Sequence, residues 1–207
     1  MYALVTDGSI TKTISGKRGI TIGDVQYPQN IFNLWSAAEK EAIGIYEVEF
    51  NNSNKRDENF YINTNQSFNF ADGKVIASYG TATAKLLEDR NEVDEAGEPL
   101  LDEKGNQVVT KGLKSQKKEI IKQQASGLLT PTDWYVIKAT DVAEYNVPSA
   151  VSTFRADVRT KSNEMETAID NASDVDALAT LYEYVNTGTE ENPVMERPLG
   201  EFPILEI

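Results

Sequence analysis

Residues 148–172 read PSAVSTFRADVRTKSNEMETAIDNA, and the spacing of apolar positions in this stretch predicts one long helix. From Val151 to Ala172 the apolar residues recur at intervals of three, four, seven, four and three, so they fall on a single helical face. The spacing is that of a heptad repeat, interrupted only at Lys161-Ser162. Pro148 is suited to the start of this helix, where a missing backbone N–H costs nothing. A stripe of this kind predicts that the helix packs against other helices.

The stripe has two possible partners. It forms either the core of a helical unit within one chain or a seam between copies of the chain. Phe154→Asp separates the two alternatives, because it unfolds the helical half in the first case and leaves a smaller folded species in the second. The residues we predict to bind a partner are Val151, Phe154, Val158, Met165 and Ile169.

Shorter helices are predicted on both sides of this stretch. Ile120 and Ile121 lie among Lys and Gln residues, and Thr130-Pro131-Thr132-Asp133-Trp134 predicts a helix start with Thr130 as the N-cap. A last helix follows at Val175–Val185. Because the connections are short, neighbouring helices should be antiparallel. We therefore expect a helical domain over residues 113–186.

The front of the chain predicts strands instead. Asp7-Gly8 and Asp72-Gly73 suit the positive backbone φ of tight hairpin turns, and alternating apolar residues flank them. One helix is predicted from Asn30, as the cap, to Ala42. Residues 1–87 thus predict a small β-rich docking domain.

The region between these halves is acidic and rich in turns. Residues 88–112 contain a tandem near-repeat, VDEAGEPL followed by LDEKGNQV, and are predicted to form a linker or a hairpin. Pro193, Pro198 and Pro203 predict an extended acidic C-terminal arm over residues 187–207. The predicted fold class is α+β, with a β-rich N-terminal domain carrying one helix, an acidic turn-rich linker and a C-terminal antiparallel helical bundle.

Composition restricts the chemistry. The 207 residues include no His and no Cys, which removes imidazole bases, thiol nucleophiles and the commonest transition-metal ligands. The acidic near-repeats lack the ligand spacing of an EF-hand loop. Gly16-Lys17-Arg18-Gly19 lacks the Gly-Lys-Ser/Thr ending of a phosphate loop. We predict no catalytic residues, no cofactor and no metal site.

The net charge of −13 argues against nucleic acid and against anionic membranes as partners. The acidity is strongest after Asn171, where Arg197 is the only basic residue. The N-terminal residues have no signal-peptide pattern, and no apolar stretch approaches the ~20 residues that span a bilayer. We expect a protein that stays out of the membrane.

Several segments resemble bacteriophage tail-fibre and tail-fibre-assembly proteins of marine phages. The resemblance lies in residues 128–137 (LLTPTDWYVI), in Val147-Pro148-Ser149, in residues 154–159 (FRADVR) and, at the front, in residues 1–5 and 41–46. It spans most of the chain and is weakest in the acidic linker and after Asn186. It contains no catalytic motif.

The resemblance implies a non-enzymatic structural component of a phage tail, associated with fibre, baseplate or adaptor. Its partners would be other tail or fibre proteins, with self-association possible. It would be made in the bacterial cytoplasm and reside in the virion tail. An assembly chaperone absent from the mature virion is the alternative within the same family. An enzyme of another class, such as a carboxylate-dependent glycan hydrolase, would require carboxylate pairs that the sequence does not single out.

Overall fold

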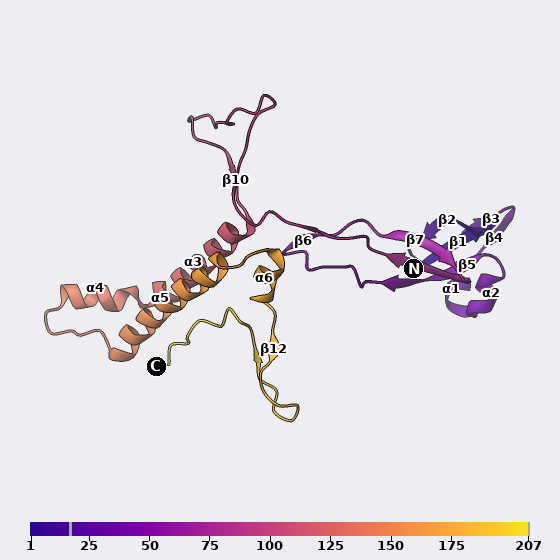
Figure 1. Ribbon diagram of the computed structural model, residues 1–207. Coiled ribbons are helices and arrows are strands. Elements are labelled where there is room, and N and C mark those ends of the chain that lie inside the picture. The colour runs from indigo at the N-terminus through magenta and orange to yellow at the C-terminus, as the bar shows by residue number, and fades with distance from the viewer. Residues whose placement is uncertain (17, 207) are drawn as a thin grey trace. The chain divides into compact units, whose positions relative to one another are not determined.

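The computed structural model describes residues 1–16 and 18–206, so Lys17 in the predicted loop at 16–19 and Ile207 at the end of the predicted arm lie outside it. The fold is α+β, with a curled five-stranded sheet and several helices, one of them long (Figure 1). The chain divides into two compact units, Met1–Thr83 and Ala84–Ile207. The acidic segment 88–112 and the C-terminal segment therefore belong to the same unit as the helices.

The first unit is built mainly of strands. In chain order its elements are β1 (Tyr2–Thr6), β2 (Ser9–Ile14), β3 (Ile20–Ile22), β4 (Val25–Tyr27), α1 (Ile31–Leu34), α2 (Ala37–Glu41), β5 (Ile45–Asn51), β6 (Tyr61–Ile62), β7 (Ser67–Ala71) and β8 (Lys74–Ser78), and β9 (Thr83–Ala84) leads into the second unit.

The main sheet has the strand order β2-β1-β5-β8-β7. All neighbours are antiparallel except β5 and β8, which are parallel. The two predicted hairpin turns are confirmed, because Asp7 and Asp72 have φ values of 51° and 52° and each is followed by a glycine with positive φ. The edge strands β2 and β7 approach each other, so the sheet curls around an interior.

A bulge in the first hairpin lets this sheet bury both of its faces. The pairing passes from Leu4↔Lys12 to Val5↔Ile10, which leaves Thr11 as the extra residue. An extra residue reverses which side the following side chains face. Ile10 accordingly packs with the core inside the curl, whereas Ile14 packs with the core on the other face.

The predicted helix from Asn30 to Ala42 is wrong in one respect, because it is two short helices. Asn30 makes no side-chain cap, and the backbone turns extended at Trp35. Ser36 starts the second helix with a capping box, in which its hydroxyl accepts from the Glu39 N–H and the Glu39 carboxylate accepts from the Ser36 N–H. The Ser-x-x-Glu motif therefore starts a second helix at this point, although the apolar spacing alone predicts one continuous helix.

The second unit contains the long helices and two small hairpins. Its elements are β10 (Arg90–Asn91), β11 (Val109–Thr110), α3 (Leu113–Leu129), the 3₁₀ turn η1 (Thr130–Thr132), α4 (Asp133–Asp141), α5 (Ser149–Asp170), α6 (Val175–Thr180), β12 (Val185–Asn186) and β13 (Met195–Glu196). Helices α3 and α5 lie side by side (Figure 1). They are antiparallel, because Lys118 near the start of α3 pairs with Asp170 at the end of α5.

The predicted N-cap at Thr130 is wrong. Thr130 has helical φ and ψ, and its hydroxyl donates to the Ser126 carbonyl one turn back. Pro131 lies within η1, where its missing N–H is tolerated. The chain therefore passes from α3 to α4 through one tight turn.

Candidate partner-binding surfaces

The predicted stripe on α5 is buried within its own unit. Val151, Val158 and Ile169 are 0% exposed, Met165 is 1% and Phe154 is 6%. Phe154 and Val158 of this stripe pack with Ala125 of α3. Half-buried side chains of α3 and of the C-terminal segment pack against the same cluster. The structure thus gives the stripe an intramolecular role, and its role as a contact with a second copy stays a prediction.

The interruption of the stripe is explained by Ser162. This serine is buried and takes the missing position of the heptad pattern, four residues after Val158 and three before Met165. Its hydroxyl donates to the Glu166 carboxylate at 3.2 Å, so its polar group has a partner. The buried face of α5 is therefore continuous, although a polar residue occupies one of its positions.

Ion pairs set the register between α3 and α5. Lys118 lies 2.6 Å from Asp170, and Lys122 lies 3.2 Å from Glu166. The hydrogen bond to Asp170 raises the pKa of Lys118, and the attraction of nearby carboxylates adds to this. Much of the positive charge of α3 is therefore matched inside the unit.

Arg155 connects α5 with the turn between α3 and α4. Its guanidinium, 11% exposed, pairs with Asp133 at 2.8 Å. The same group donates to the Leu129 carbonyl at 3.0 Å and to the Thr132 hydroxyl. One planar side chain on α5 thus holds the corner where α3 turns into α4.

Helix α4 has no buried residue, although its sequence is apolar. Trp134 is 50% exposed and Ile137 is 59% exposed. Lys138 lies over the rings of Trp134 and Tyr145, at 6.0 and 4.3 Å from their centroids. Beyond the corner held by Arg155, α4 presents a row of large apolar side chains on the surface.

Residues 90–110 form a three-way junction, in which a stem of β10 paired with β11 carries two hairpin arms (Figure 1). The bridges Val93↔Pro99 and Leu101↔Gln107 close two side arms, one for each near-repeat. The hairpin alternative for this segment is thus closer to the structure than the linker alternative.

The centre of this junction is a ring of backbone hydrogen bonds. The Glu92 N–H donates to Val108, the Leu100 N–H to Glu92 and the Val108 N–H to Leu100, at 2.8–3.0 Å. The side-chain amide nitrogen of Gln107 lies 2.7, 3.2 and 3.0 Å from the carbonyl oxygens of Glu92, Leu100 and Val108. A single side chain therefore contacts the stem and both arms at the point where they meet.

The tips of the two arms are built alike. The carboxylate of Asp94 accepts from the N–H groups of Ala96 and Glu98, and that of Asp102 from the N–H groups of Lys104 and Asn106. Donation by Asn106, first from its backbone and then from its side chain, lowers the pKa of Asp102. These aspartates close turns.

The base of the junction is joined to α3 by Asp89. Its carboxylate accepts from the Gly112 N–H at 2.8 Å and from the Ser115 hydroxyl at 2.9 Å. These hydrogen bonds, that of Gly112 first, lower the pKa of Asp89. At Gly112 a Cβ would lie 2.4 Å from the backbone of Glu88, so the close approach requires glycine. The junction is therefore held firmly against the start of α3.

A second hairpin, β12 with β13, precedes the C-terminal segment. Tyr184, Val185 and Met195 in this region are 53%, 49% and 55% exposed. Beside it Tyr182 lies between two cations, with Lys117 at 5.0 Å and Arg197 at 5.9 Å from its ring centroid. Burial raises the pKa of Tyr182 to about 12, against a smaller opposing effect of Arg197.

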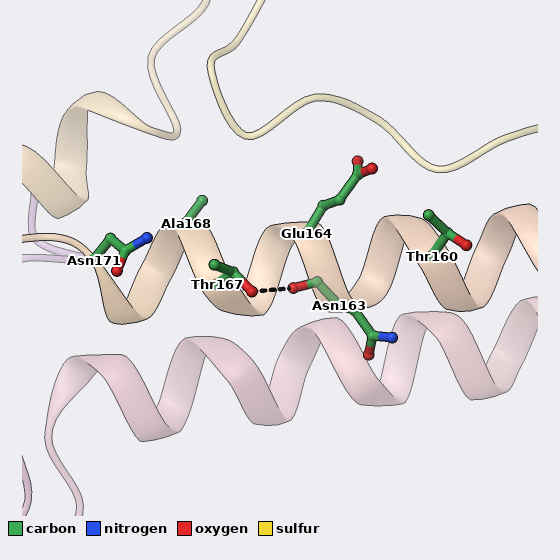
Figure 2. Close-up of a pocket in the computed structure, with 6 residues that line it drawn as sticks. All are labelled: Thr160, Asn163, Glu164, Thr167, Ala168 and Asn171. Carbon is green, nitrogen blue, oxygen red and sulfur yellow. Dashed lines mark hydrogen bonds between the residues drawn. The ribbon is translucent and has the colours of Figure 1, made fainter.

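Several hollows lie on the surface of the helical unit. Figure 2 shows one of them, which is lined along a single face of α5 by Thr160, Asn163, Glu164, Thr167, Ala168 and Asn171. The Thr167 hydroxyl donates to the Asn163 carbonyl within the helix, and Glu164 is the only carboxylate in the lining. In residues 1–16 and 18–206, no group of three or more acidic side chains is placed to hold a metal ion.

A helix that crosses a bilayer must be both long and apolar. Among the helices that the structure describes, none combines these two properties.

The sequence did not indicate the structural roles of Arg155, Gln107 and Asp89. Each of these side chains joins elements that lie far apart in the chain. No local pattern indicates the role of Asp89, because its partners Gly112 and Ser115 follow it by 23 and 26 residues in the chain. No sequence pattern indicates that Gln107 reaches three carbonyls. Trp134 and Ile137 were correctly placed on a helix, but their exposure was not foreseen.

No protein-family profile, curated protein sequence or solved structure matches this chain.

Proposed function

We propose that this chain is a non-enzymatic structural component of a bacteriophage tail, associated with fibre, baseplate or adaptor, that acts through protein–protein contacts. In this proposal a β-rich N-terminal domain docks onto a neighbouring tail protein, and a C-terminal antiparallel helical bundle presents the remaining contact surfaces. The resemblance in residues 128–137 and 154–159 supports the tail assignment.

The observation that carries the proposal is the exposure of α4. None of the nine residues of this helix is buried, and Trp134, Val136 and Ile137 are exposed, so a partner surface that covers them would stabilise both. Trp134 has the large, rigid ring that commonly anchors protein interfaces. Exposed apolar side chains on the two hairpins of the same unit add further contact points, among them Val93, Leu100, Leu101, Val109, Val185, Val194 and Met195.

The charge indicates the kind of partner. A chain with a net charge of −13 is attracted to a basic protein surface and repelled by nucleic acid and anionic lipid. We therefore propose other tail or fibre proteins as partners, without nucleic acid and without a membrane. The chain is made in the bacterial cytoplasm and is carried in the tail of the virion.

The lack of catalytic chemistry in the proposal rests on composition, because the sequence offers no His or Cys. A glycan hydrolase needs two carboxyl groups about 5–10 Å apart across the scissile bond, and the hollow lined by Asp157, Glu164 and Glu201 is where Asp→Asn and Glu→Gln changes would test that alternative.

Mass spectrometry of purified mature particles tests the proposal. We expect peptides of this chain in intact particles, at a constant ratio to a known tail protein across preparations. Absence from particles, together with a requirement for the chain when fibre is produced, would instead identify a tail-fibre assembly chaperone and overturn the proposal.

A further inference from the structure

The C-terminal end of the chain covers an apolar groove between α3 and α5. The groove is lined by Ala125, Phe154 and Val158, with Leu128 and Leu129 at its edge. Phe202 and Leu205 pack into it. We call residues 201–206 the C-terminal strap. Two of the five residues predicted from sequence to bind a partner, Phe154 and Val158, thus lie beneath a segment from the far end of the chain.

The strap is firmly attached only where it begins. Leu199, 2% exposed, donates its N–H to the Leu181 carbonyl at 3.0 Å. Arg197 donates to the Gly200 carbonyl at 3.1 Å and pairs with Glu201 at 2.8 Å. The Tyr184 hydroxyl also donates to Glu201. These contacts fix the chain as far as the first residue of the strap.

Beyond Glu201 the strap rests on side chains alone. In the part of the chain that the structure describes, residues 202–206 make no backbone hydrogen bond to the helices. Hollows of about 390 and 420 Å³ border the strap, and Ile204 between them is 86% exposed. A segment held by two side chains beside open space opens at low cost.

We propose that the strap of one copy binds the α3–α5 groove of a second copy. The structure shows which chemistry the groove accepts, a Phe and a Leu three residues apart on an extended segment, and an identical segment of another copy offers the same side chains. Exchange of this kind costs little, because each groove still holds a Phe and a Leu after its own strap has moved to the other copy. The hinge of the exchange lies directly after Glu201, the last residue that the contacts of Arg197 and Tyr184 hold.

The exchange deepens the proposed function by giving the assembly a self-association surface, and in that respect it rests on the tail role. It also predicts a salt dependence. Two chains that each carry a net charge of −13 repel one another, so salt that screens this repulsion strengthens the exchange.

Disulfide trapping with single-cysteine chains tests the exchange, because the 207-residue chain contains no Cys. Thr153 and Glu206 line the same hollow, and neither belongs to the apolar contact. We would mix the Thr153→Cys chain with the Glu206→Cys chain, oxidise the mixture, and measure the mixed disulfide on non-reducing gels. The matched control mixes Thr167→Cys, on a different hollow of α5, with the same Glu206→Cys chain.

We expect the Thr153→Cys mixture to give on the order of tenfold more mixed disulfide than the control, since a bound strap raises the effective concentration of its thiol. The yield should rise with salt. Equal yields in the two mixtures would overturn the exchange.

A Thr153→Cys/Glu206→Cys double variant, diluted before oxidation, shows whether the geometry allows a disulfide at all. If it closes within one chain while the mixture gives none, the strap stays in its own groove and the proposal is wrong. If it does not close, the strap does not lie in the groove, and the proposal loses its basis. If the mixed disulfide forms but the chain is absent from particles, the tail role alone is overturned. If the chain is present in particles but no mixed disulfide forms, the exchange alone is overturned.

Discussion

Single side chains hold together parts of the helical unit that are distant in the chain. The Arg155 guanidinium joins α5 to the corner between α3 and α4, and the Gln107 amide joins the stem and the two arms of the junction. Both side chains donate to backbone carbonyls of residues that are distant in the chain or belong to another arm. Partners of this kind are set by tertiary structure, which explains why residue-type patterns did not reveal them.

Tyr182 makes a pH-dependent contribution to stability. Its pKa is raised from 10.0 to about 12 by burial, so the native state keeps its proton where the unfolded state loses it. Below about pH 10 both states are protonated and the contribution is constant. Between about pH 10 and 12 the unfolded state gains stability by ionising, so the protein is destabilised as the pH rises.

We therefore expect Tyr182→Phe to reduce the loss of stability between about pH 10 and 12, as measured by urea unfolding at each pH. In the native wild type, absorbance titration should show a tyrosine with a pKa of about 12 that is missing from Tyr182→Phe. Parallel unfolding curves for the two proteins across this range would contradict the burial of the Tyr182 hydroxyl.

At the scale of elements, local patterns predicted well wherever a single local interaction decides the structure. The hairpins at Asp7-Gly8 and Asp72-Gly73 and the helix from Pro148 follow from backbone preference and apolar spacing. The predictions of a single helix from Asn30 to Ala42 and of an N-cap at Thr130 were wrong, because each depends on which of two competing local signals prevails. The three-way junction and the packing of Leu199 depend on contacts that no local pattern contains.

The α5 stripe gives the clearest prediction at this scale. Met165→Ala removes a side chain that is 1% exposed and leaves a cavity, so we expect a loss of about 2–5 kcal/mol in the free energy of unfolding. Ser162→Ala lies on the same face but removes only one hydroxyl, with an expected loss of at most about 1.5 kcal/mol. Urea denaturation followed by circular dichroism at 222 nm compares them.

Equal unfolding midpoints for the two variants would show that the stripe does not form a packed core in the single chain. Stripe residues can both form the core and contact a second copy only near the strap. There Phe154 and Val158 are covered by Phe202 and Leu205, which we propose to exchange between copies. Met165 and Ile169 lie further along α5, and the antiparallel α3 runs beside this helix.

At the scale of the whole molecule, the two units have separate cores. The strands bury side chains on both faces of a curled sheet, and the helices bury the α5 stripe. The sequence predicted a change from strands to helices, and it placed the acidic segment 88–112 between them. What it did not predict is that much of the apolar surface of the second unit faces outward, on α4 and on two hairpins.

The central claim is that these outward side chains bind neighbouring proteins in a tail. The most direct measurement is a competition for incorporation, in which wild type and Trp134→Ser/Ile137→Ser are produced together during phage growth and their ratio in purified particles is measured by mass spectrometry. Both side chains are at least half exposed, so the variant should fold, and circular dichroism of the isolated protein checks this. We predict that particles contain the wild type and are depleted of the variant relative to the cell extract. Equal incorporation of the two chains, or the absence of both from particles, would contradict the account.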